Sequence, residues 1–276
     1  MIKDVMVRLD GTAADELRLA AVATIAQTFE SHVIGLFINR LPMIVPAEWD
    51  GISGLHAAQL IEEARKAGDK IESVLIERLT RLQSPVEIHR RDGFEDSAAS
   101  IAAQEARAAD TFVALRPNGA PQEPEQLIES VLFESGRHLF LVPDGKSGRV
   151  SFDHVFVAWN GSRESARALA EALPYLHKAQ RVTIVSVVEK PLVEEEALIG
   201  RDAAQHLGHH GIDAMLHQVV GKSRDAGEIL IAEARKRKAD LIVMGGYGRS
   251  RLREWLLGGV TYTLMHEAPV PLLVAH

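Results

Sequence analysis

Residues 241–260, LIVMGGYGRSRLREWLLGGV, decide the fold of this chain and point to a ligand site. An apolar run typical of a buried β-strand is followed by glycines, and a second glycine pair comes shortly after. At Gly245, Gly248 and Gly258 the missing Cβ lets the main chain adopt unusual φ and ψ values and lets a ligand approach the peptide N–H groups. Such N–H groups, gathered at the start of a helix, attract anions and above all phosphate. The stretch therefore predicts a strand, a loop that exposes its backbone, and a helix start.

The length of 276 residues suits either one large α/β domain or two domains of half that size. Hydrophobic residues make up 46% and charged residues 25%, which is typical of a globular chain with a buried core. The net charge of −7 argues against a nucleic-acid partner, because neutralising its phosphates needs clustered Lys and Arg. There is no Cys, which excludes disulfides, thiolate metal sites and cysteine nucleophiles.

The first residues, MIKDVMVRLDG, lack the apolar stretch of a secretory signal. No run approaches the roughly 20 apolar residues of a membrane helix. Together with the absence of Cys, this favours a soluble protein of a reducing compartment, and we expect the cytoplasm and no membrane partner.

Apolar runs and helical patterns alternate along the first half of the chain. A turn and helix N-cap are expected at Asp10, Gly11 and Thr12, directly after the first strand. The expected strands are 5–9, 32–38, 86–89, 111–115 and 139–142, and the expected helices are 12–29, 55–82, 97–108 and 127–134.

The same order of elements begins again after a short linker at 144–149. The matching segments are VMVRLDGT (5–12) with VFVAWNGS (155–162), SHVIGLF (31–37) with RVTIVSV (181–187), and EARAADTFVAL (105–115) with EARKRKADLIVMG (233–245). Such a repeat predicts two copies of one domain, at 1–145 and 150–276. Each is predicted to be a Rossmann-like, doubly wound α/β domain with a five-stranded, mostly parallel sheet. Ligands bind such sheets beyond the carboxyl ends of the strands, where Asp10, Asn160 and the glycines after Met244 are expected.

The glycine spacing resembles the nucleotide-binding signature of the universal stress protein family, Gly-x2-Gly-x9-Gly-(Ser/Thr). Asn160-Gly161-Ser162 stands where that family has a strand ending in Asp-Gly-Ser. Ala239-Asp240 precedes the strand before the glycines, and Pro269-Val270-Pro271 precedes the last strand, as in the family. We therefore identify the chain as a tandem universal stress protein, with two family units of the adenine nucleotide alpha hydrolase-like fold.

The resemblance implies ATP or a related adenine nucleotide, with or without Mg²⁺, in the second unit of a stress-response binding or signalling module. Gly245 and Gly248 would border the ribose and phosphates, and Val187 would lie beside the adenine. The other implied contacts come from Asn160, Gly161, Ser162, Arg249, Gly258, Gly259, Val260 and Thr261. Lys222, Arg249 or Arg251 would add positive charge near the phosphates.

Two departures from the family pattern predict an altered site. Asn160 replaces the usual Asp, which removes a carboxylate acceptor but keeps an amide that donates and accepts. Gly259 replaces the usual Ser or Thr, which leaves Thr261 as the remaining hydroxyl. The alternative, that these glycines only allow a tight strand-to-helix connection, stays open.

The first unit has lost the glycine loop, since the stretch after Leu115 reads RPNGAPQEPEQLIESVLFE. Prolines stiffen it, and Glu123, Glu125 and Glu129 would repel phosphate. We expect no nucleotide there. The first unit is instead expected to replace the second member of a family dimer, pairing Leu139–Val142 with Leu272–Val274. A homodimer of the whole chain and a further protein partner stay open.

Other motifs have structural interpretations. Gly221-Lys222-Ser223 resembles the end of a phosphate-binding P-loop, but Leu216 occupies the position of the first glycine, so we expect a strand-to-helix turn. His206 and His210 have metal-ligand spacing, but cations at a helix C-terminus explain them better and we expect no metal site. The apolar segment Pro42–Trp49 is either packed on its own sheet or a surface for a ligand or partner.

No residue stands out as a catalytic base, and we predict no catalytic residues. Any ATP hydrolysis is expected to be slow. A nucleotide-free interaction module and a slow ATPase remain alternative functions.

Overall fold

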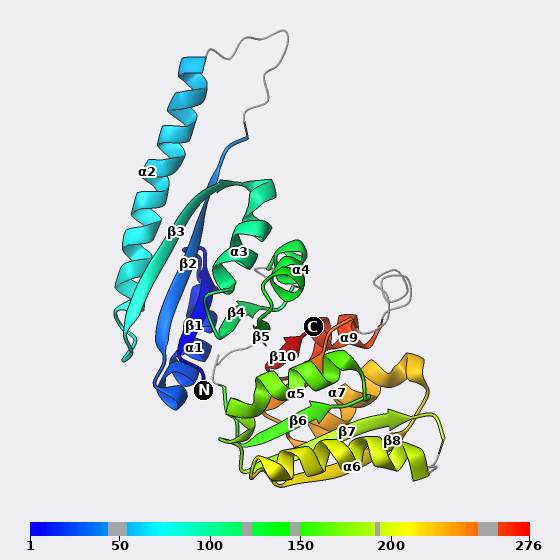
Figure 1. Cartoon of the computed structure of the whole chain (residues 1–276). Helices are drawn as coiled ribbons and strands as arrows, with labels where there is room; N and C mark the ends of the chain where they lie inside the picture. The colour runs from blue at the N-terminus through cyan, green and yellow to red at the C-terminus, as the bar shows by residue number, and fades with distance from the viewer. Residues whose placement is uncertain (44–53, 118–122, 144–149, 191–193, 248–258) are drawn as a thin grey trace. The chain divides into compact units, whose positions relative to one another are not determined.

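The computed structural model describes residues 1–43, 54–117, 123–143, 150–190, 194–247 and 259–276 (Figure 1). The predicted linker 144–149 lies outside these residues, as does most of the apolar segment Pro42–Trp49. The chain divides into two compact units, one of Ile2–Val113 with Pro124–Arg137 and one of Ala114–Glu123 with His138–His276. The repeat boundary at 145–150 stays a prediction.

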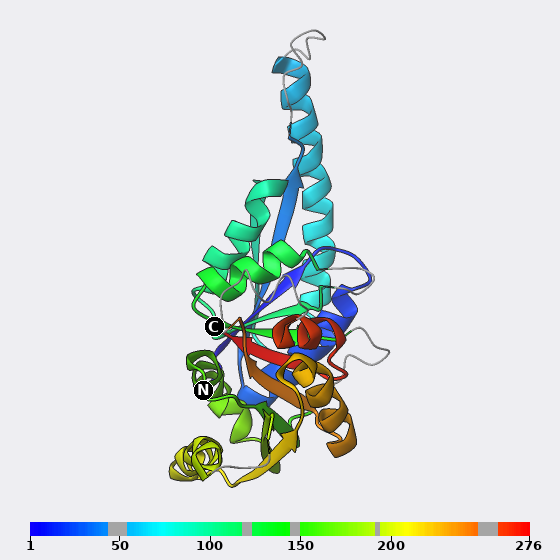
Figure 2. The same cartoon turned by 90° about the vertical axis from the view of Figure 1, so that its right-hand side faces the viewer.

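The unit of Ile2–Val113 and Pro124–Arg137 is built on parallel strands in the order β3-β2-β1-β4. Helices α2 and α3 lie on opposite faces of these strands (Figures 1 and 2). The elements are β1 (Asp4–Leu9), α1 (Asp15–Phe29), β2 (His32–Leu41), α2 (Gly54–Leu79), β3 (Val86–Phe94), a short 3₁₀ helix (Glu95–Ser97), α3 (Ala98–Ala106), β4 (Thr111–Leu115) and α4 (Glu125–Glu134).

The other unit has the strand order β5-β10-β9-β6-β7-β8, and only the β5–β10 pair is antiparallel among its described ladders. Figure 2 shows α5 and α6 on one face of these strands and α7 and α9 on the other. The elements are β5 (His138–Val142), β6 (His154–Ala158), α5 (Arg163–Leu176), β7 (Arg181–Val188), α6 (Glu194–His209), β8 (Ala214–Val220), a 3₁₀ helix (Ser223–Asp225), α7 (Ala226–Arg237), β9 (Leu241–Gly245), α9 (Val260–Glu267) and β10 (Leu272–Ala275).

The predicted fold class is confirmed: within the described residues each half of the sequence supplies five strands, and the sheets are mostly parallel. Strand β5 of the first half lies in the sheet of the second-half unit instead of in its own. The first strand of each half forms the centre of its core, because its apolar residues are buried on both faces. Val5, Met6 and Val7 in β1 correspond to Val155, Phe156 and Val157 in β6, and all six are at most 1% exposed. Near-continuous apolar runs of this kind are what a sheet covered on both faces requires.

The predicted pairing of Leu139–Val142 with Leu272–Val274 is present. Leu141 faces Leu272, and Leu139 faces Val274, in the antiparallel β5–β10 ladder. The Phe140 ring stacks on Tyr175 of α5, with ring centroids 5.9 Å apart. Strand β5 from the first half therefore completes the sheet of the second-half unit.

Some elements differ in extent from the sequence-based prediction. Helix α1 begins at Asp15 instead of near Thr12, because the Asp15 carboxylate accepts hydrogen bonds from the backbone N–H groups of Asp10 and Gly11 and holds that segment as a turn. Strands β2 and β3 continue beyond their apolar runs, where the Asn39 amide donates to Asp92 over 2.9 Å. Polar pairs of this kind extend a ladder without leaving an apolar pattern in the sequence.

Candidate functional site

In the second-half unit the carboxyl ends of β6 and β9 lie side by side. Val157 of β6 is level with Val243 of β9 in their parallel ladder. The chain leaves β6 towards β7, on the opposite side from β9, so the strand order reverses between β6 and β9. This is the position where open α/β sheets bind ligands. The candidate site is built from the chain segments that follow these two strands.

The segment after β6 is a tight turn that caps the next helix. The Asn160 side-chain oxygen accepts a hydrogen bond from the Ser162 N–H over 3.0 Å, and Gly161 has a φ of +73°, which favours glycine. The Ser162 hydroxyl oxygen then accepts from the Ser165 N–H over 3.1 Å at the start of α5. Asn160 is exposed, and its amide nitrogen has no hydrogen-bond partner within the described parts of the chain.

Gly245, the last residue of β9, has a packing role. A Cβ on Gly245 would lie 2.4 Å from the Glu164 carbonyl carbon and 2.4 Å from the Ser165 nitrogen. Neither backbone atom can move aside without displacing the first turn of α5. The tight-connection interpretation therefore accounts for this glycine of the signature.

Glu164 was not singled out from the sequence, although it lies directly against Gly245. Its side chain is nearly buried and its carboxylate accepts from the Arg163 guanidinium over 2.9 Å. Burial opposes ionisation, but the backbone N–H of Glu164 and the Arg163 guanidinium outweigh it and lower the pKa of the Glu164 carboxyl. An acidic residue in the first turn of a helix, where the dipole favours it, is the only sequence signal for this charge.

The loop after β9 is held by backbone contacts on one side and by α9 on the other. The Gly246 N–H donates to the Ala275 carbonyl over 2.8 Å, and the His276 ring nitrogen Nδ1 lies 3.0 Å from the Gly246 carbonyl oxygen. Tyr247 has a φ of +55°, and its N–H donates to the Thr261 hydroxyl oxygen over 3.1 Å. The unusual backbone conformation expected at the glycines therefore occurs at Tyr247, while Gly245 and Gly246 do not have positive φ.

Helix α9 begins at Val260 with Gly259 as its N-cap residue, at a φ of −62° and a ψ of 161°. Glycine has no side chain with which to cap the first turn. The first N–H groups of a helix have no partner within that helix, so they are available to an acceptor outside it. The Tyr247–Thr261 hydrogen bond brings this helix start to the carboxyl end of β9.

Val187 lies near the end of β7, opposite Val219, and is partly exposed. A Cβ on Gly221 would lie 3.6 Å from a methyl carbon of Val187, so the Gly221-Lys222 turn is its neighbour. This turn joins β8 to the 3₁₀ helix before α7, as predicted. The Ser223 hydroxyl donates to the Glu189 carboxylate over 2.7 Å. In a P-loop the corresponding hydroxyl would serve the phosphate site, but here it is bonded to a glutamate.

The structure thus brings the Asn160–Ser162 turn, Gly245 and the start of α9 to the carboxyl ends of neighbouring strands. Val187 lies on β7, two residues beyond Val185, which pairs with Ala158 of β6. The predicted contact residues outside the described part of the chain are Gly248, Arg249, Arg251 and Gly258.

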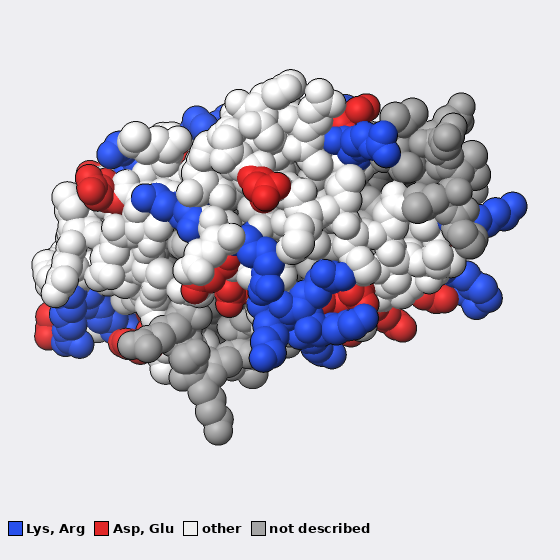
Figure 3. Space-filling model, turned by 90° about the horizontal axis from the view of Figure 1, so that it is seen from below, with Lys and Arg blue, Asp and Glu red and all other residues white. Residues whose placement is uncertain are grey.

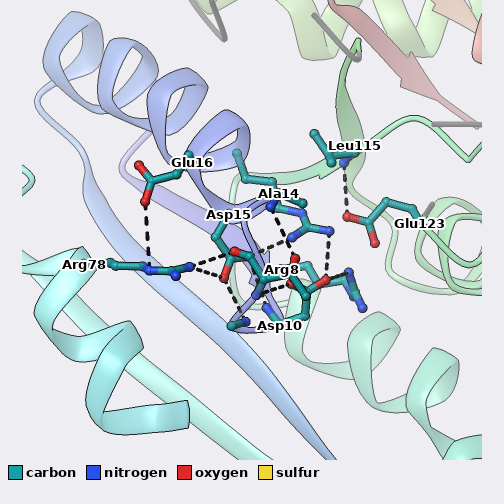
Figure 4. Close-up of polar contacts among 11 residues, drawn as sticks. Arg8, Asp10, Ala14, Asp15, Glu16, Arg78, Leu115 and Glu123 are labelled. Atoms are coloured by element: carbon teal, nitrogen blue, oxygen red, sulfur yellow. Dashed lines mark hydrogen bonds and ion pairs between the residues drawn. The ribbon is translucent and has the colours of Figure 1, made fainter. Parts of the chain in front are cut away.

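The corresponding position in the first-half unit holds a buried network of charges (Figure 4). Arg18 is completely buried and donates to Asp15 over 2.7 Å and to Asp10 over 3.2 Å. Arg8 pairs with Asp10 at 3.0 Å, and Arg78 pairs with Asp15 at 3.1 Å. By the alignment of the repeats, the second half has Ala158, Asn160, Ser165 and Ala168 where this network has Arg8, Asp10, Asp15 and Arg18.

In the first half an acidic side chain, Glu123, lies at the end of β4, where the second half has the first glycine of the signature. Leu115 stands at the position of Gly245, and its N–H donates to the Glu123 carboxylate over 3.2 Å. Glu123 is 1% exposed, so one of the three glutamates expected to repel phosphate lies within the protein at this point. Figure 4 shows the Leu115–Glu123 contact.

The other candidate sites have structural explanations. The His206 and His210 rings lie 4.8 Å apart where α6 ends at His209, and Gly211 follows with a φ of +74°. The described residues contain no group of three His, Cys, Asp or Glu side chains able to hold a metal ion.

Basic side chains gather beside acidic ones on the face seen in Figure 3. Apart from what that view shows, three basic residues stand together in the last turn of α7: Arg235, Lys236 and Arg237. Lys236 and Arg237 pair with Glu233, at 3.3 and 3.1 Å. Cations at a helix C-terminus are favoured by the dipole, so this group needs no bound partner to explain it.

None of the helices in the described ranges is both long enough and apolar enough to cross a membrane. The apolar segment Pro42–Trp49 is described only at Pro42 and Met43, and Met43 is 58% exposed.

Comparison with known proteins finds a family match for the second half and similar folds over the whole chain. Residues 151–276 match the model of the universal stress protein family. A universal stress protein from Archaeoglobus fulgidus is similar over 99% of this chain and 97% of its own, with a TM-score of 0.75 and 17% identity. A protein from Pseudomonas aeruginosa proposed to be a universal stress protein covers 99% of this chain and 93% of its own, with a TM-score of 0.61 and 17% identity.

These two similarities extend the fold to the first half of the chain. A universal stress protein in complex with cAMP matches 45% of this chain and 97% of its own, at 25% identity and a TM-score of 0.38. No curated protein matches the sequence.

Proposed function

Because residues 151–276 belong to the universal stress protein family, we propose that the second-half unit binds ATP or a related adenine nucleotide. The nucleotide would lie beyond the carboxyl ends of β6 and β9, with its phosphates towards the start of α9. The protein would act as a stress-response binding or signalling module in the cytoplasm, and its output would pass to a partner that recognises the loaded state.

The observation that carries this proposal is the position of a helix start without a side-chain cap. Gly259 begins α9 with no side-chain hydrogen bond, and the first turn of α9 is tied to Tyr247 at the end of β9. An uncapped helix N-terminus combines free N–H donors with the positive end of the helix dipole. A phosphate group at Gly259, Val260 and Thr261 would satisfy both.

The side chains around this position fit a neutral or anionic ligand. Ala158 and Asn160 leave the end of β6 without charge, whereas Arg8 and Asp10 fill the equivalent place in the first half with an ion pair. The amide nitrogen of Asn160 can donate to a ribose or adenine acceptor, and Val187 offers an apolar surface near the end of β7. The negative charge of Glu164 is offset by Arg163.

Magnesium would enter with the phosphates, since no described group of acidic side chains is able to hold the ion by itself. Lys222, in the turn next to Val187, would add positive charge near the nucleotide. The contacts expected from Gly248, Arg249 and Gly258 belong to this proposal as predictions from the signature.

We propose that the first-half unit binds no nucleotide. Its Arg18 and Arg8 guanidiniums already neutralise the Asp10 carboxylate after β1. The N–H of Leu115, which aligns with Gly245, already donates to Glu123. A nucleotide would have to displace charges that are paired and buried, at a cost of several kcal/mol. One nucleotide per chain is the expected stoichiometry.

Titration calorimetry of the full chain with ATP, ADP and AMP tests this function. The matched variant is Gly259→Val, because the φ of −62° and ψ of 161° at Gly259 are allowed to valine while its branched side chain blocks the helix start. We expect the wild type to bind at least one nucleotide once per chain and the variant to bind none, with unchanged circular dichroism.

If the wild type binds none of the three nucleotides at millimolar concentration, the proposed nucleotide function is wrong. A nucleotide-free interaction module is then the better hypothesis. Binding of two nucleotides per chain would contradict the empty first-half unit. Release of ADP from bound ATP, absent in the variant, would support slow hydrolysis.

A further inference from the structure

We propose that Thr261 is a positioning residue: its hydroxyl holds Tyr247 in the left-handed conformation and so fixes the Gly246–Tyr247 backbone at the end of β9, beside the proposed nucleotide position. The inference rests on the proposed function for its consequence, but its structural part concerns the chain without ligand. It assigns to Thr261 a role different from the direct phosphate contact expected from the sequence.

The backbone of Tyr247 is exceptional among the described residues. Only Glu30, Lys238 and Tyr247 are non-glycine residues with positive φ. Glu30 and Lys238 are the C-cap residues of α1 and α7, where a left-handed residue commonly ends a helix. Tyr247 instead follows a strand, so helix termination does not explain its φ of +55°. A bulky residue in this conformation persists only where its surroundings impose it.

A hydrogen bond to the Thr261 hydroxyl holds the Tyr247 backbone in this conformation. The loop is fixed up to Gly246 by its own hydrogen bonds to Ala275 and His276. At the next residue the Tyr247 N–H donates to the Thr261 oxygen over 3.1 Å. Thr261 is 3% exposed and lies in the first turn of α9, so its oxygen is held by the packing of that helix.

Burial decides between positioning and direct contact. A side chain that is 3% exposed offers little surface to a ligand, while the peptide groups on both sides of the hydrogen bond lie at the proposed phosphate position. A nucleotide therefore gains from Thr261 through a Gly246–Tyr247 backbone that is already held in place before binding, and a lower ordering cost gives higher affinity.

Amide hydrogen exchange on the full chain without ligand tests the structural part. Thr261→Val keeps the shape and removes the acceptor, Thr261→Ser keeps the hydroxyl, and Thr263→Val is the matched control two residues along the same helix. Thr263 lies against Gly227 of α7, since a Cβ on Gly227 would be 2.7 Å from the Thr263 Cβ. We expect the Tyr247 amide to exchange at least about five-fold faster in Thr261→Val, at the wild-type rate in Thr263→Val, and close to it in Thr261→Ser.

Nucleotide affinity tests the functional part with the same variants. A hydrogen bond of ordinary strength corresponds to an affinity loss of about three- to ten-fold in Thr261→Val. Thr261→Ser should restore most of it, and Thr263→Val should match the wild type. In a Tyr247→Gly background the left-handed conformation is free of strain, so we expect the Thr261→Val loss to shrink.

The outcomes separate this inference from the proposed function. Unchanged exchange of the Tyr247 amide in Thr261→Val overturns the positioning role, whether or not nucleotide binds. An affinity loss that Thr261→Ser does not restore also overturns it, because the hydroxyl is then not the cause. If the wild type binds no nucleotide while exchange behaves as expected, the hydrogen bond stands and the proposed function falls.

Discussion

Arg18 and Asp10 form an ion pair of 3.2 Å at the end of β1, while the aligned residues after β6 are Ala168 and Asn160. Arg18 has no exposed side-chain surface and also pairs with the fully buried Asp15. The two halves of the chain therefore differ at this position. In the first half the charged side chains pair with one another. In the second half the aligned residues are uncharged.

Arg18→Ala should destabilise the protein by about 3 kcal/mol, because it leaves the buried Asp15 carboxylate with one guanidinium fewer. Asp15 keeps its contact with Arg78, at 3.1 Å, which limits the loss. Denaturant unfolding of the full chain measures the effect. The double variant Asp15→Ser/Arg18→Ala, which copies the second-half residues, should lose less than Arg18→Ala alone. An equal or larger loss would show that the buried charge is not what makes Arg18 necessary.

The same network predicts how stability depends on pH. Burial opposes ionisation of Asp10, but Arg18, Thr12 and Arg8 outweigh it and place the pKa of Asp10 well below its usual range. The folded pKa is then lower than the unfolded value of about 3.9, so the contribution of Asp10 is complete above about pH 5 and is lost as the pH falls below 4.

For Asp15 the sign is opposite, because burial and the Asp10 charge raise its pKa. The folded protein then takes up this proton first, and the contribution of Asp15 grows as the pH falls from its raised pKa towards about 4. Unfolding free energies between pH 7 and about 2.5 should show a smaller acid loss in Asp10→Asn. They should also show a weaker rise on mild acidification in Asp15→Asn. Wild-type pH profiles in both variants would contradict these assignments.

The repeated apolar runs were sufficient to predict the fold class, since Val5–Val7 and Val155–Val157 recur with the same turn after them. The β5–β10 pairing was predicted from the resemblance to a family dimer, in which the first half replaces the second member. The charge network could not be predicted. Asp15 and Arg18 are three residues apart in a helix, and this spacing is also typical of ion pairs on an exposed helix surface. Only the structure shows that both side chains are buried. Tyr247 was hidden for a different reason: its positive φ depends on Thr261, which is distant in sequence.

Asn160→Asp should increase nucleotide affinity several-fold by restoring the carboxylate acceptor usual in the family. The turn should survive, because Asp10 makes the same contact in the first half, where its carboxylate accepts from the Thr12 N–H over 3.0 Å. Calorimetry measures the affinity, and Asn160→Ala is the control that removes both donor and acceptor. Equal affinity in the wild type, Asn160→Asp and Asn160→Ala would mean that the ligand does not contact this side chain.

Gly259→Ser should raise both stability and nucleotide affinity. The backbone at Gly259 is already that of a helix N-cap, a position where serine is preferred, and the gain over glycine is a few tenths of a kcal/mol. The added hydroxyl also restores the usual donor to phosphate. Gly259→Ala has no oxygen and should gain neither. Thermal unfolding and ATP titration of the wild type, Gly259→Ser and Gly259→Ala check this. Equal ATP affinity in the two variants would show that the hydroxyl does not contact the nucleotide.

Gly245→Ala should lower the free energy of unfolding of the second-half unit by several kcal/mol, because the new Cβ would lie 2.4 Å from backbone atoms of Glu164 and Ser165. Any loss of nucleotide binding would then follow from displacement of α5, and a saturating nucleotide would only partly restore the unfolding midpoint.

Gly200→Ala is the matched control within α6, where a Cβ would meet only a Leu216 methyl group at 3.5 Å. Alanine is the better helix former, so this variant should gain about 0.5–1 kcal/mol in denaturant unfolding. If Gly245→Ala were as stable as the wild type and still lost nucleotide binding, the glycine would be kept for ligand approach, and the packing explanation of this part of the signature would be wrong.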